Sequence, residues 1–282
     1  MKNLTAIHFL NIETLVREDE VYNIHVDYDG NLILLVKKKV GNREQNTIFH
    51  ILSSGVREIN FPVVSESFDL AQPLGENWLL VRSRTENKNE KNAFIFDIHG
   101  NLVNAFPIGD AIQDIQTTKE SDIWVSYFDE GIGDSSGLNC FNNQGIQTFD
   151  FYDFVKETGS VVPYIDDCYA LNVTSDYTYI YYYSAFPIVK LNKNDFEIFH
   201  NIPVEGSHAF SIKNDFVLFS HDYDHKGEVQ LYSLRNNNVE RFYTLNQEGK
   251  PLNYHYAVSR ESKLFLMNDK DIYLLNLEDI LQ

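Results

Sequence analysis

The chain has few cysteines and no long apolar run. Its 282 residues include only two cysteines, Cys140 and Cys168, which are too few for a disulfide scaffold and predict a reducing cytoplasmic location. No segment approaches the roughly 18 consecutive apolar residues that a membrane-spanning helix requires. Residues 1–10 lead directly into an acidic stretch, so they do not resemble a secretory signal peptide. We therefore expect a cytoplasmic protein that does not enter a membrane.

Positive charge is also scarce. The chain has 23 Lys and Arg against 41 Asp and Glu, which gives a formal net charge of −18. This charge repels nucleic-acid phosphates and anionic lipids, so we expect neither as a partner. A basic protein or a small cationic ligand is favoured instead. Because 43% of the residues are hydrophobic, the composition is that of a globular protein, and we expect one domain over residues 1–282.

Helical periodicity is nearly absent, whereas aromatic residues are abundant. The chain has 20 Phe, 17 Tyr and 2 Trp, and they lie in short alternating or continuous apolar runs. Such runs are typical of β-strands. Only the segment from Asp150 to Thr158 has the pattern of a short helix. The sequence therefore predicts an all-β protein.

The strand-like segments recur at a regular spacing. The starts of successive segments are separated by 46, 45, 56, 37 and 48 residues. Units of roughly 40–50 residues with four strands each are typical of propeller blades. The equivalent starts are Leu32, Trp78, Ile123, Tyr179, Phe216 and Leu264.

Turn residues form a second marker with the same period. Gly55, Gly100 and Gly145 are 45 residues apart, and Asn194 and Asn237 follow after 49 and 43 residues. Gly and Asn tolerate the positive φ that tight hairpin turns require. Each of them precedes a short apolar segment that we interpret as the outer strand of a unit. These outer strands are expected at residues 56–61, 102–106, 146–151, 196–199 and 239–243.

The last unit is incomplete, and the start of the chain offers the missing strand. The third strand of that unit, residues 272–277, ends five residues before the C-terminus, and residues 6–12 precede the first unit as a spare strand. Pairing the two would remove an exposed sheet edge. On these features the sequence resembles the six-bladed β-propeller superfamily. The resemblance implies six antiparallel four-stranded blades, of which the N-terminal strand completes the last.

This resemblance is to an architecture, and no motif selects a family within it. The chain lacks the blade signature of WD40 repeats and the double-glycine pattern of kelch repeats. Its period also looks similar to those of lactonase-like and NHL-type propellers. A pair of β-sandwiches is the competing architecture.

The predicted topology sorts the connections onto two faces. Tight turns at residues 27–31, 97–101 and 142–145 fall on one face, where Asx side chains favour hairpins. Irregular segments fall on the other face, which is therefore where we expect a binding site. The insertion 152–166 belongs to this face, and it acts either as a lid or as a structural plug. The remaining irregular segments are residues 85–91, 128–136 and 222–227.

Polar residues recur about nine positions before the unit starts. Because these positions lie on the innermost strands near the irregular loops, we expect them to surround the mouth of a central channel. Oxygen and imidazole donors that converge there would suit a divalent cation or a cationic ligand. The alternative is that each residue caps a strand or bonds the backbone of a neighbouring blade. The candidates are Asn23, Asp69, Asp114, Asp167, His208 and His255.

Asp129 and Glu130 are a further candidate pair on the same face. They are adjacent carboxylates beside aromatic residues in an irregular segment. Neighbouring acids can raise each other's pKa and serve acid–base chemistry, although exposed acidic pairs are usually only solvated.

Two functions are consistent with these patterns. The first is a non-enzymatic binding module, because no complete catalytic set is present and the net charge is strongly negative. It would present its loop-rich face to a protein or small-ligand partner and would need no cofactor. The second is a metal-dependent hydrolase similar to the lactonase-like propellers, in which one divalent cation polarises an ester carbonyl. The chain departs from that family because it lacks a clearly placed Glu and Asn ligand pair.

Overall fold

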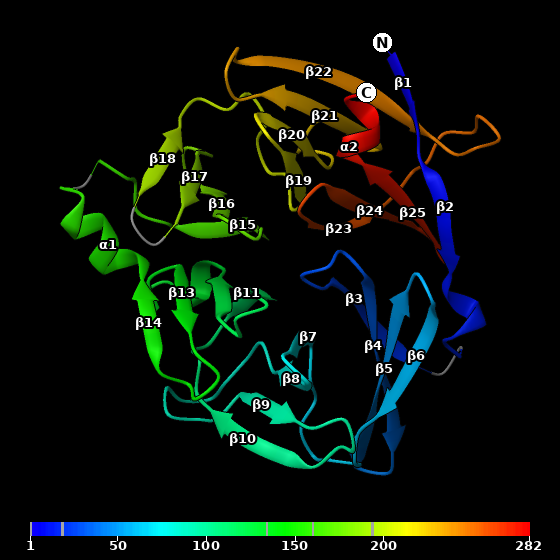
Figure 1. Cartoon of the computed structure of the whole chain (residues 1–282), viewed down its shortest axis with the longest axis vertical. Helices are drawn as coiled ribbons and strands as arrows, with labels where there is room; N and C mark the ends of the chain where they lie inside the picture. The colour runs from blue at the N-terminus through cyan, green and yellow to red at the C-terminus, as the bar shows by residue number, and fades with distance from the viewer. Residues whose placement is uncertain (1, 18–19, 134, 160, 193–194) are drawn as a thin grey trace. The chain divides into compact units, whose positions relative to one another are not determined.

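The computed structural model describes residues 2–17, 20–133, 135–159, 161–192 and 195–282, and it is all-β. The chain divides into two compact units (Figure 1). The central unit consists of residues 16–168, and the terminal unit consists of residues 1–15 and 169–282. Among the described residues, neither α-helix has the length and hydropathy needed to cross a lipid bilayer.

The central unit contains three four-stranded sheets, each a meander in which consecutive strands pair. Helix α1 (Phe151–Glu157) follows the third sheet, and its N-terminus is capped by the Asp150 side chain, as the short-helix prediction required. The first sheet is β3 (Val21–Val26), β4 (Leu32–Val40), β5 (Arg43–Leu52) and β6 (Gly55–Asn60). The second is β7 (Leu70–Leu74), β8 (Asn77–Val81), β9 (Ala93–Phe96) and β10 (Leu102–Phe106). The third is β11 (Ile112–Thr117), β12 (Ile123–Tyr127), β13 (Leu138–Phe141) and β14 (Gln147–Asp150).

The terminal unit contains the other three sheets, and two of them include strands from the start of the chain. The fourth sheet is β15 (Asp167–Val173), β16 (Thr178–Tyr183), β17 (Ile188–Leu191) and β18 (Phe196–Phe199). The fifth is β19 (Phe210–Lys213), β20 (Phe216–Phe219), β21 (Glu228–Ser233) and β22 (Asn238–Leu245), joined by β1 (Lys2–Thr5). The sixth is β23 (Tyr256–Arg260), β24 (Lys263–Asn268), β25 (Asp271–Asn276) and β2 (Ile7–Asn11), and helix α2 (Leu277–Ile280) ends the chain.

The predicted repeat is confirmed. All six predicted starts lie in the second strand of a sheet, and the sheets have the strand organisation of a six-bladed β-propeller. The turn residues Gly55, Gly100, Gly145 and Asn237 all have positive φ, as hairpin turns require. Asn194 lies outside the described residues. The predicted outer strands correspond to β6, β10, β14, β18 and β22.

The tight turns share one hydrogen-bonding pattern, in which an Asx oxygen accepts from two backbone N–H groups. Asp27 Oδ1 accepts from the N–H groups of residues 29 and 31, both at 2.8 Å. Asp97, Asn142 and Asn246 accept in the same way from the residues two and four positions later. This side-chain chemistry explains why short Asx–Gly segments predicted the hairpins correctly.

The N-terminal strand completes the sixth sheet, as predicted. β2 pairs antiparallel with β25, with Ile7 opposite Leu274. The sequence did not predict β1, which pairs in parallel with β22 and adds a fifth strand to the fifth sheet. One segment of about ten residues thus lies along the edges of two consecutive sheets of the terminal unit.

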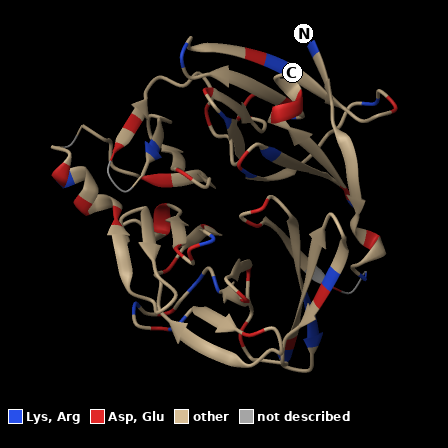
Figure 2. Cartoon of the chain, in the orientation of Figure 1, with Lys and Arg blue, Asp and Glu red and all other residues tan. Residues whose placement is uncertain are grey.

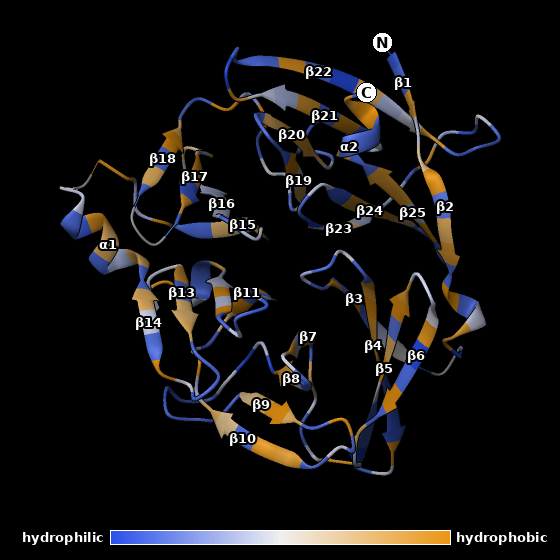
Figure 3. Cartoon of the chain, in the orientation of Figure 1, coloured by the Kyte–Doolittle hydropathy of each residue, from blue (hydrophilic) through white to orange (hydrophobic). Residues whose placement is uncertain are grey.

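The apolar core lies between neighbouring sheets within each unit. In the central unit, one cluster joins the first and second sheets and another joins the second and third. In the terminal unit, the corresponding clusters join the fourth to the fifth sheet and the fifth to the sixth. Figure 3 shows hydrophobic residues concentrated in strands and hydrophilic residues in the connections.

Buried polar side chains link the innermost strands of neighbouring sheets. Gln72 on β7 donates to the backbone oxygen of Val26 on β3 at 3.1 Å, and Thr117 on β11 donates to that of Pro73 at 2.7 Å. Both side chains are almost fully buried. Hydrogen bonds to neighbouring backbone satisfy polar groups that would otherwise be costly to bury. Polar residues on inner strands therefore hold the sheets of the central unit together.

His25 on β3 is a buried titratable group in the same region. Its side chain is only 6% exposed, and a hydrogen bond joins it to the backbone of Asp69. Burial lowers the pKa of His25 from 6.5 to about 4, because a charged imidazole would lose its hydration. His25 is therefore neutral in the folded protein at neutral pH.

We expect His25 to make the fold sensitive to acid. Between pH 6.5 and about 4 the unfolded chain binds a proton at this residue that the folded chain does not, so stability falls as the pH falls. The difference between the two pKa values corresponds to about 3 kcal/mol. Urea unfolding of the wild type and of His25→Gln at pH 7 and pH 4.5 measures the loss. His8→Gln, at an exposed histidine, is the control, and equal pH dependence in all three proteins would contradict the expectation.

Candidate binding surface

Asn23 and Asp69 lie close together in the central unit. The Asn23 Nδ2 donates to the backbone oxygen of Asp69 at 2.9 Å. The Asp69 carboxylate accepts from the backbone N–H of Ser83 at 3.1 Å and from its hydroxyl at 2.9 Å, and it pairs with the Lys37 ammonium at 3.2 Å. The charge of Asp69 is thus already balanced by a cation from the neighbouring sheet. These contacts connect sheets, and a ligand-binding role for either residue stays a prediction.

Asp114 makes short-range contacts on β11. One carboxylate oxygen accepts from the N–H of Ile115 at 2.8 Å, and the other accepts from Gln116 Nε2 at 3.1 Å. Two residues that follow it in the same chain segment thus contact its side chain, and a ligand-binding role for Asp114 stays a prediction.

Asp129 and Asp167 are brought together, although the sequence separates them by 38 residues. The carboxylate of Asp167, the first residue of β15, accepts a hydrogen bond from the backbone N–H of Asp129. Partial burial raises the pKa of Asp167, and the negative charge of Asp129 raises it further. Glu130 has a different partner, because its carboxylate forms an ion pair with Arg84. The two adjacent acids thus have different partners, and their role as a binding pair stays a prediction.

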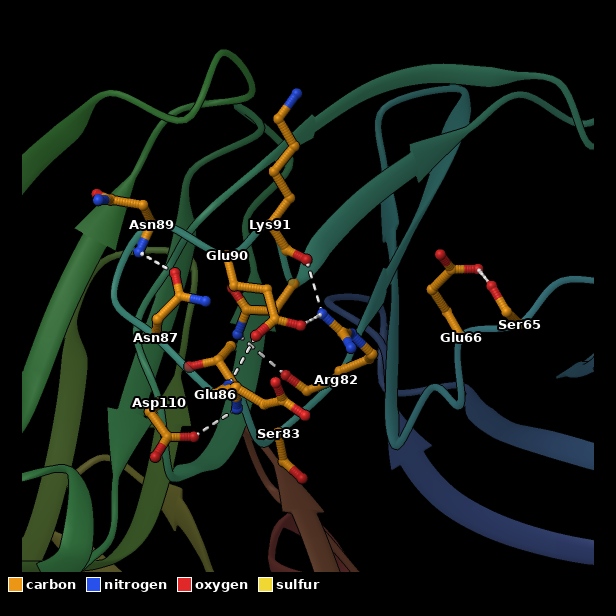
Figure 4. Close-up of polar contacts among 12 residues, drawn as sticks. Ser65, Glu66, Arg82, Ser83, Glu86, Asn87, Asn89, Glu90, Lys91 and Asp110 are labelled. Carbon is orange, nitrogen blue, oxygen red and sulfur yellow. Dashed lines mark hydrogen bonds and ion pairs between the residues drawn. The ribbon is translucent and has the colours of Figure 1, made fainter.

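Arg84 belongs to a braced loop between β8 and β9, which Figure 4 shows. At the base of this loop, Arg82 pairs with Glu90 at 2.5 Å, and Glu90 also accepts from the backbone N–H of Glu86 at 2.7 Å. Asp110 accepts from the backbone N–H of Thr85 at 2.6 Å. Residues 82–92 contain four basic and two acidic side chains, so the loop has a formal net charge of +2. The pair of Arg82 and Glu90 lies within the loop, whereas Arg84 pairs with Asp110 and Glu130 outside it.

The insertion 152–166 buries apolar side chains in the central unit. Val155 of α1, Val162 and Ile165 are almost fully buried. A Cβ on Gly137 would lie 2.5 Å from Ile165 Cβ, so glycine permits this close packing. Ser160 lies outside the described residues. The lid and the structural plug both stay predictions for this insertion.

The terminal unit presents a cluster of aromatic side chains that sequence reasoning did not predict. The Tyr169 ring stacks on His208, with centroids 4.7 Å apart and planes inclined by 15°. Tyr169 and Tyr223 are hydrogen-bonded through their hydroxyl groups. Phe186 contacts both tyrosines and also Tyr183. We call these five residues, Tyr169, Tyr183, Phe186, His208 and Tyr223, the aromatic cluster.

Two neighbouring sheets supply the aromatic cluster. Tyr169 is on β15, Tyr183 is the last residue of β16, and Phe186 lies in the connection from β16 to β17. His208 precedes β19, and Tyr223 lies in the connection from β20 to β21. These are the irregular connections and strand ends that the topology assigned to the loop-rich face. His208 is the one member of the aromatic cluster that the sequence identified as a candidate.

The aromatic cluster has a buried base and an exposed surface. Phe186 is 4% exposed and stacks on the fully buried Tyr181, whereas Tyr183 is 46% and Tyr223 is 53% exposed. Gly206 has φ of +83°, and a Cβ there would lie 2.3 Å from the Tyr223 ring. The glycine therefore lets the backbone pass directly beneath that ring. Large apolar surfaces held in fixed positions at the protein surface commonly mark interaction sites.

His208 and His221 are neutral at neutral pH. Partial burial lowers the pKa of His208, and the nearby His221 lowers it further. The pKa of His221 is also lowered, first by partial burial and then by Lys226. The surface of the aromatic cluster therefore presents uncharged rings.

His255 is not part of the aromatic cluster. It is exposed, and its backbone N–H donates to Met267 at 3.0 Å. Within the described part of the chain, no ring contact or hydrogen bond joins its side chain to His208. No group of three or more His, Cys, Asp and Glu side chains among the described residues is arranged to hold a metal ion. The predicted grouping of all eight candidates around one channel mouth stays a prediction.

Comparisons with known proteins support the fold. The model of the YxzG family matches residues 138–275, and no curated protein matches the chain in sequence. The WD40 domain of Neurospora crassa Pan2 is similar in structure, with a TM-score of 0.55 at 10% identity over 94% of this chain and 92% of that domain. A functionally unknown protein from Desulfotomaculum acetoxidans gives a TM-score of 0.54 at 10% identity, over 91% and 82% of the two chains. At these identities, the similarity establishes the β-propeller fold alone.

Proposed function

We propose that this protein is a binding module and that the aromatic cluster recognises a basic segment of a partner protein. The observation that carries the proposal is the exposure of Tyr183 and Tyr223 on a fixed, buried base. Tyrosine and arginine are, with tryptophan, enriched in the energetically dominant parts of protein interfaces. An exposed tyrosine surface on a rigid scaffold is therefore suited to binding a protein.

The charge of the chain favours a basic partner. The net charge is −18, and acidic residues lie on loops of both units and on both helices (Figure 2). A Lys or Arg side chain that approaches such a protein is attracted at long range, and the face of a tyrosine ring attracts it at short range. The chain itself contains such a cation–π contact, since the Lys190 ammonium lies 4.1 Å from the centre of the Tyr177 ring. The neutral histidines beside the tyrosines do not oppose a cation.

Binding of a basic peptide tests the proposal. The probe is a peptide of alternating arginine and glycine, and its affinity is measured by calorimetry at two salt concentrations. We expect saturable binding that weakens with salt and that Tyr223→Ala weakens about tenfold, because a cation–π contact contributes roughly 0.5–2 kcal/mol. The matching peptide of alternating glutamate and glycine should not bind.

The matched control variant is Tyr152→Ala in the central unit. Tyr152 is 48% exposed, but the Lys156 ammonium already lies 3.9 Å from the centre of its ring. This substitution removes a similar exposed tyrosine and should leave the affinity unchanged. If both variants lose affinity equally, or neither does, the aromatic cluster is not the binding surface.

A further inference from the structure

The terminal unit contains a pocket that is separate from the aromatic cluster. It has a volume of about 360 Å³, and four segments of the chain form it. β1 contributes Asn3, β22 contributes Tyr243 and Thr244, and the connection from β20 to β21 contributes Lys226 and Gly227. The segment before β23 supplies Pro251, Leu252 and Asn253. This volume lies at the lower end of the range for small-molecule sites.

The base of the pocket is held in place by hydrogen bonds. The hydroxyl of the buried Thr244 lies 2.7 Å from the backbone oxygen of Gly227 and 3.3 Å from that of Leu252. Gly227 has φ of +76°, and a Cβ there would lie 3.2 Å from the Leu252 oxygen. The connection from β20 to β21 can therefore approach the segment before β23 closely. Tyr254 adds a further link, because its hydroxyl donates to the backbone oxygen of Glu228 at 2.5 Å. The pocket is thus formed before any ligand binds.

The chemistry of the rim differs from that of the base. Lys226 supplies a positive charge, and within the described residues no acidic side chain forms an ion pair with it. Asn3, Asn253 and Tyr243 are exposed on the rim and provide amide and hydroxyl groups that can donate hydrogen bonds. Leu252 at the base is buried, and Pro251 adds apolar surface. A cation and neutral donors over an apolar base suit an anion with a small apolar body.

We propose that this pocket binds a small aliphatic carboxylate, with the Lys226 ammonium as the partner of the carboxylate and Pro251 and Leu252 in contact with the hydrocarbon. The charge-assisted hydrogen bond supplies specificity for the anion. Because Asn3 is on β1, the pocket is complete only when the N-terminal strand is paired with β22.

Sodium butanoate is the probe, and amide chemical shifts of the isotope-labelled full chain report its binding. Butanoate has six non-hydrogen atoms, and at a binding free energy of roughly −0.7 kcal/mol per atom its Kd would be about 1 mM. We expect saturable shifts at Gly227 and Leu252 and no comparable shifts with butanamide, which has the same shape without the charge.

Two lysine variants complete the test. Lys226→Gln should weaken butanoate binding at least about tenfold, since it removes a charge-assisted hydrogen bond. Lys250→Gln, which removes an exposed lysine from the turn between Asn246 and Pro251, should leave binding unchanged. Absence of saturable shifts, equal binding of butanamide, or equal loss in both variants would overturn the proposal.

Discussion

Deletion of residues 2–11 should prevent the terminal unit from folding stably. The deletion removes β1 and β2, so it exposes the edges of β22 and β25 at once. It also removes Ala6, which is fully buried and whose N–H donates to Leu245 at 2.8 Å, and Leu4, which packs on the same apolar cluster. Because a domain has a free energy of unfolding of about 5–15 kcal/mol, this loss should be comparable to the total. Exposed edges should also promote association between chains.

Circular dichroism and size-exclusion chromatography measure the result. The truncated chain should lack a cooperative thermal transition for the terminal unit and should elute as aggregates. Addition of a synthetic peptide of residues 2–12 should restore part of the transition. Removal of the exposed Gln282 from the other end of the chain is the control. A monomeric truncated chain with the wild-type melting temperature would show that the paired N-terminal strands are dispensable.

The second large effect is expected at Asn172 on β15. This side chain is fully buried, and its Nδ2 donates to the backbone oxygens of Phe210 at 2.7 Å and Glu261 at 3.2 Å. Its Oδ1 accepts from the N–H of Glu261 at 2.8 Å. One amide group therefore connects three consecutive sheets of the terminal unit. The Glu261 oxygen keeps a second donor, the N–H of Ile212, but the other two groups depend on Asn172.

Asn172→Leu should lower the free energy of unfolding by about 2–6 kcal/mol. Leucine has a similar volume but leaves a buried acceptor and a buried donor unsatisfied, and each costs about 1–3 kcal/mol. Chemical denaturation measures the change. Asn143→Leu, at an exposed turn position, controls for the residue type and should change stability little. A loss below about 1 kcal/mol in Asn172→Leu would mean that water or backbone movement satisfies the freed groups.

The repeat could be predicted because its signals are local. Each unit start is a short apolar run on a second strand, and each turn has an Asx or Gly residue whose own side chain or φ defines the hairpin. β1 carried no such signal. Three of its four residues are exposed, and its partner β22 lies more than 230 residues away. Edge pairing of a short polar strand leaves no periodicity in the sequence.

The candidate site could be predicted only in part, because side-chain partners come from distant segments. The spacing of the inner strands identified Asp69 as a candidate. It did not predict that Lys37 from the neighbouring sheet forms an ion pair with Asp69. The same spacing identified His208 as a candidate, but it did not predict that tyrosine rings lie beside His208. Tyr169 and Tyr223 meet although 54 residues separate them, and the aromatic pattern of each segment alone is that of an ordinary strand or turn. Spacing predicts sheets better than it predicts contacts between them.

The pairing of β2 with β25 constrains when the protein can fold during its synthesis. Leu274 is synthesised 267 residues after its partner Ile7. The sixth sheet therefore cannot be completed until β25 has been made, and β2 stays without this partner strand while the intervening segments are synthesised. Contacts between residues so far apart in sequence also slow folding after release. A chaperone that shields β2 would accordingly be of most use before β25 has been synthesised.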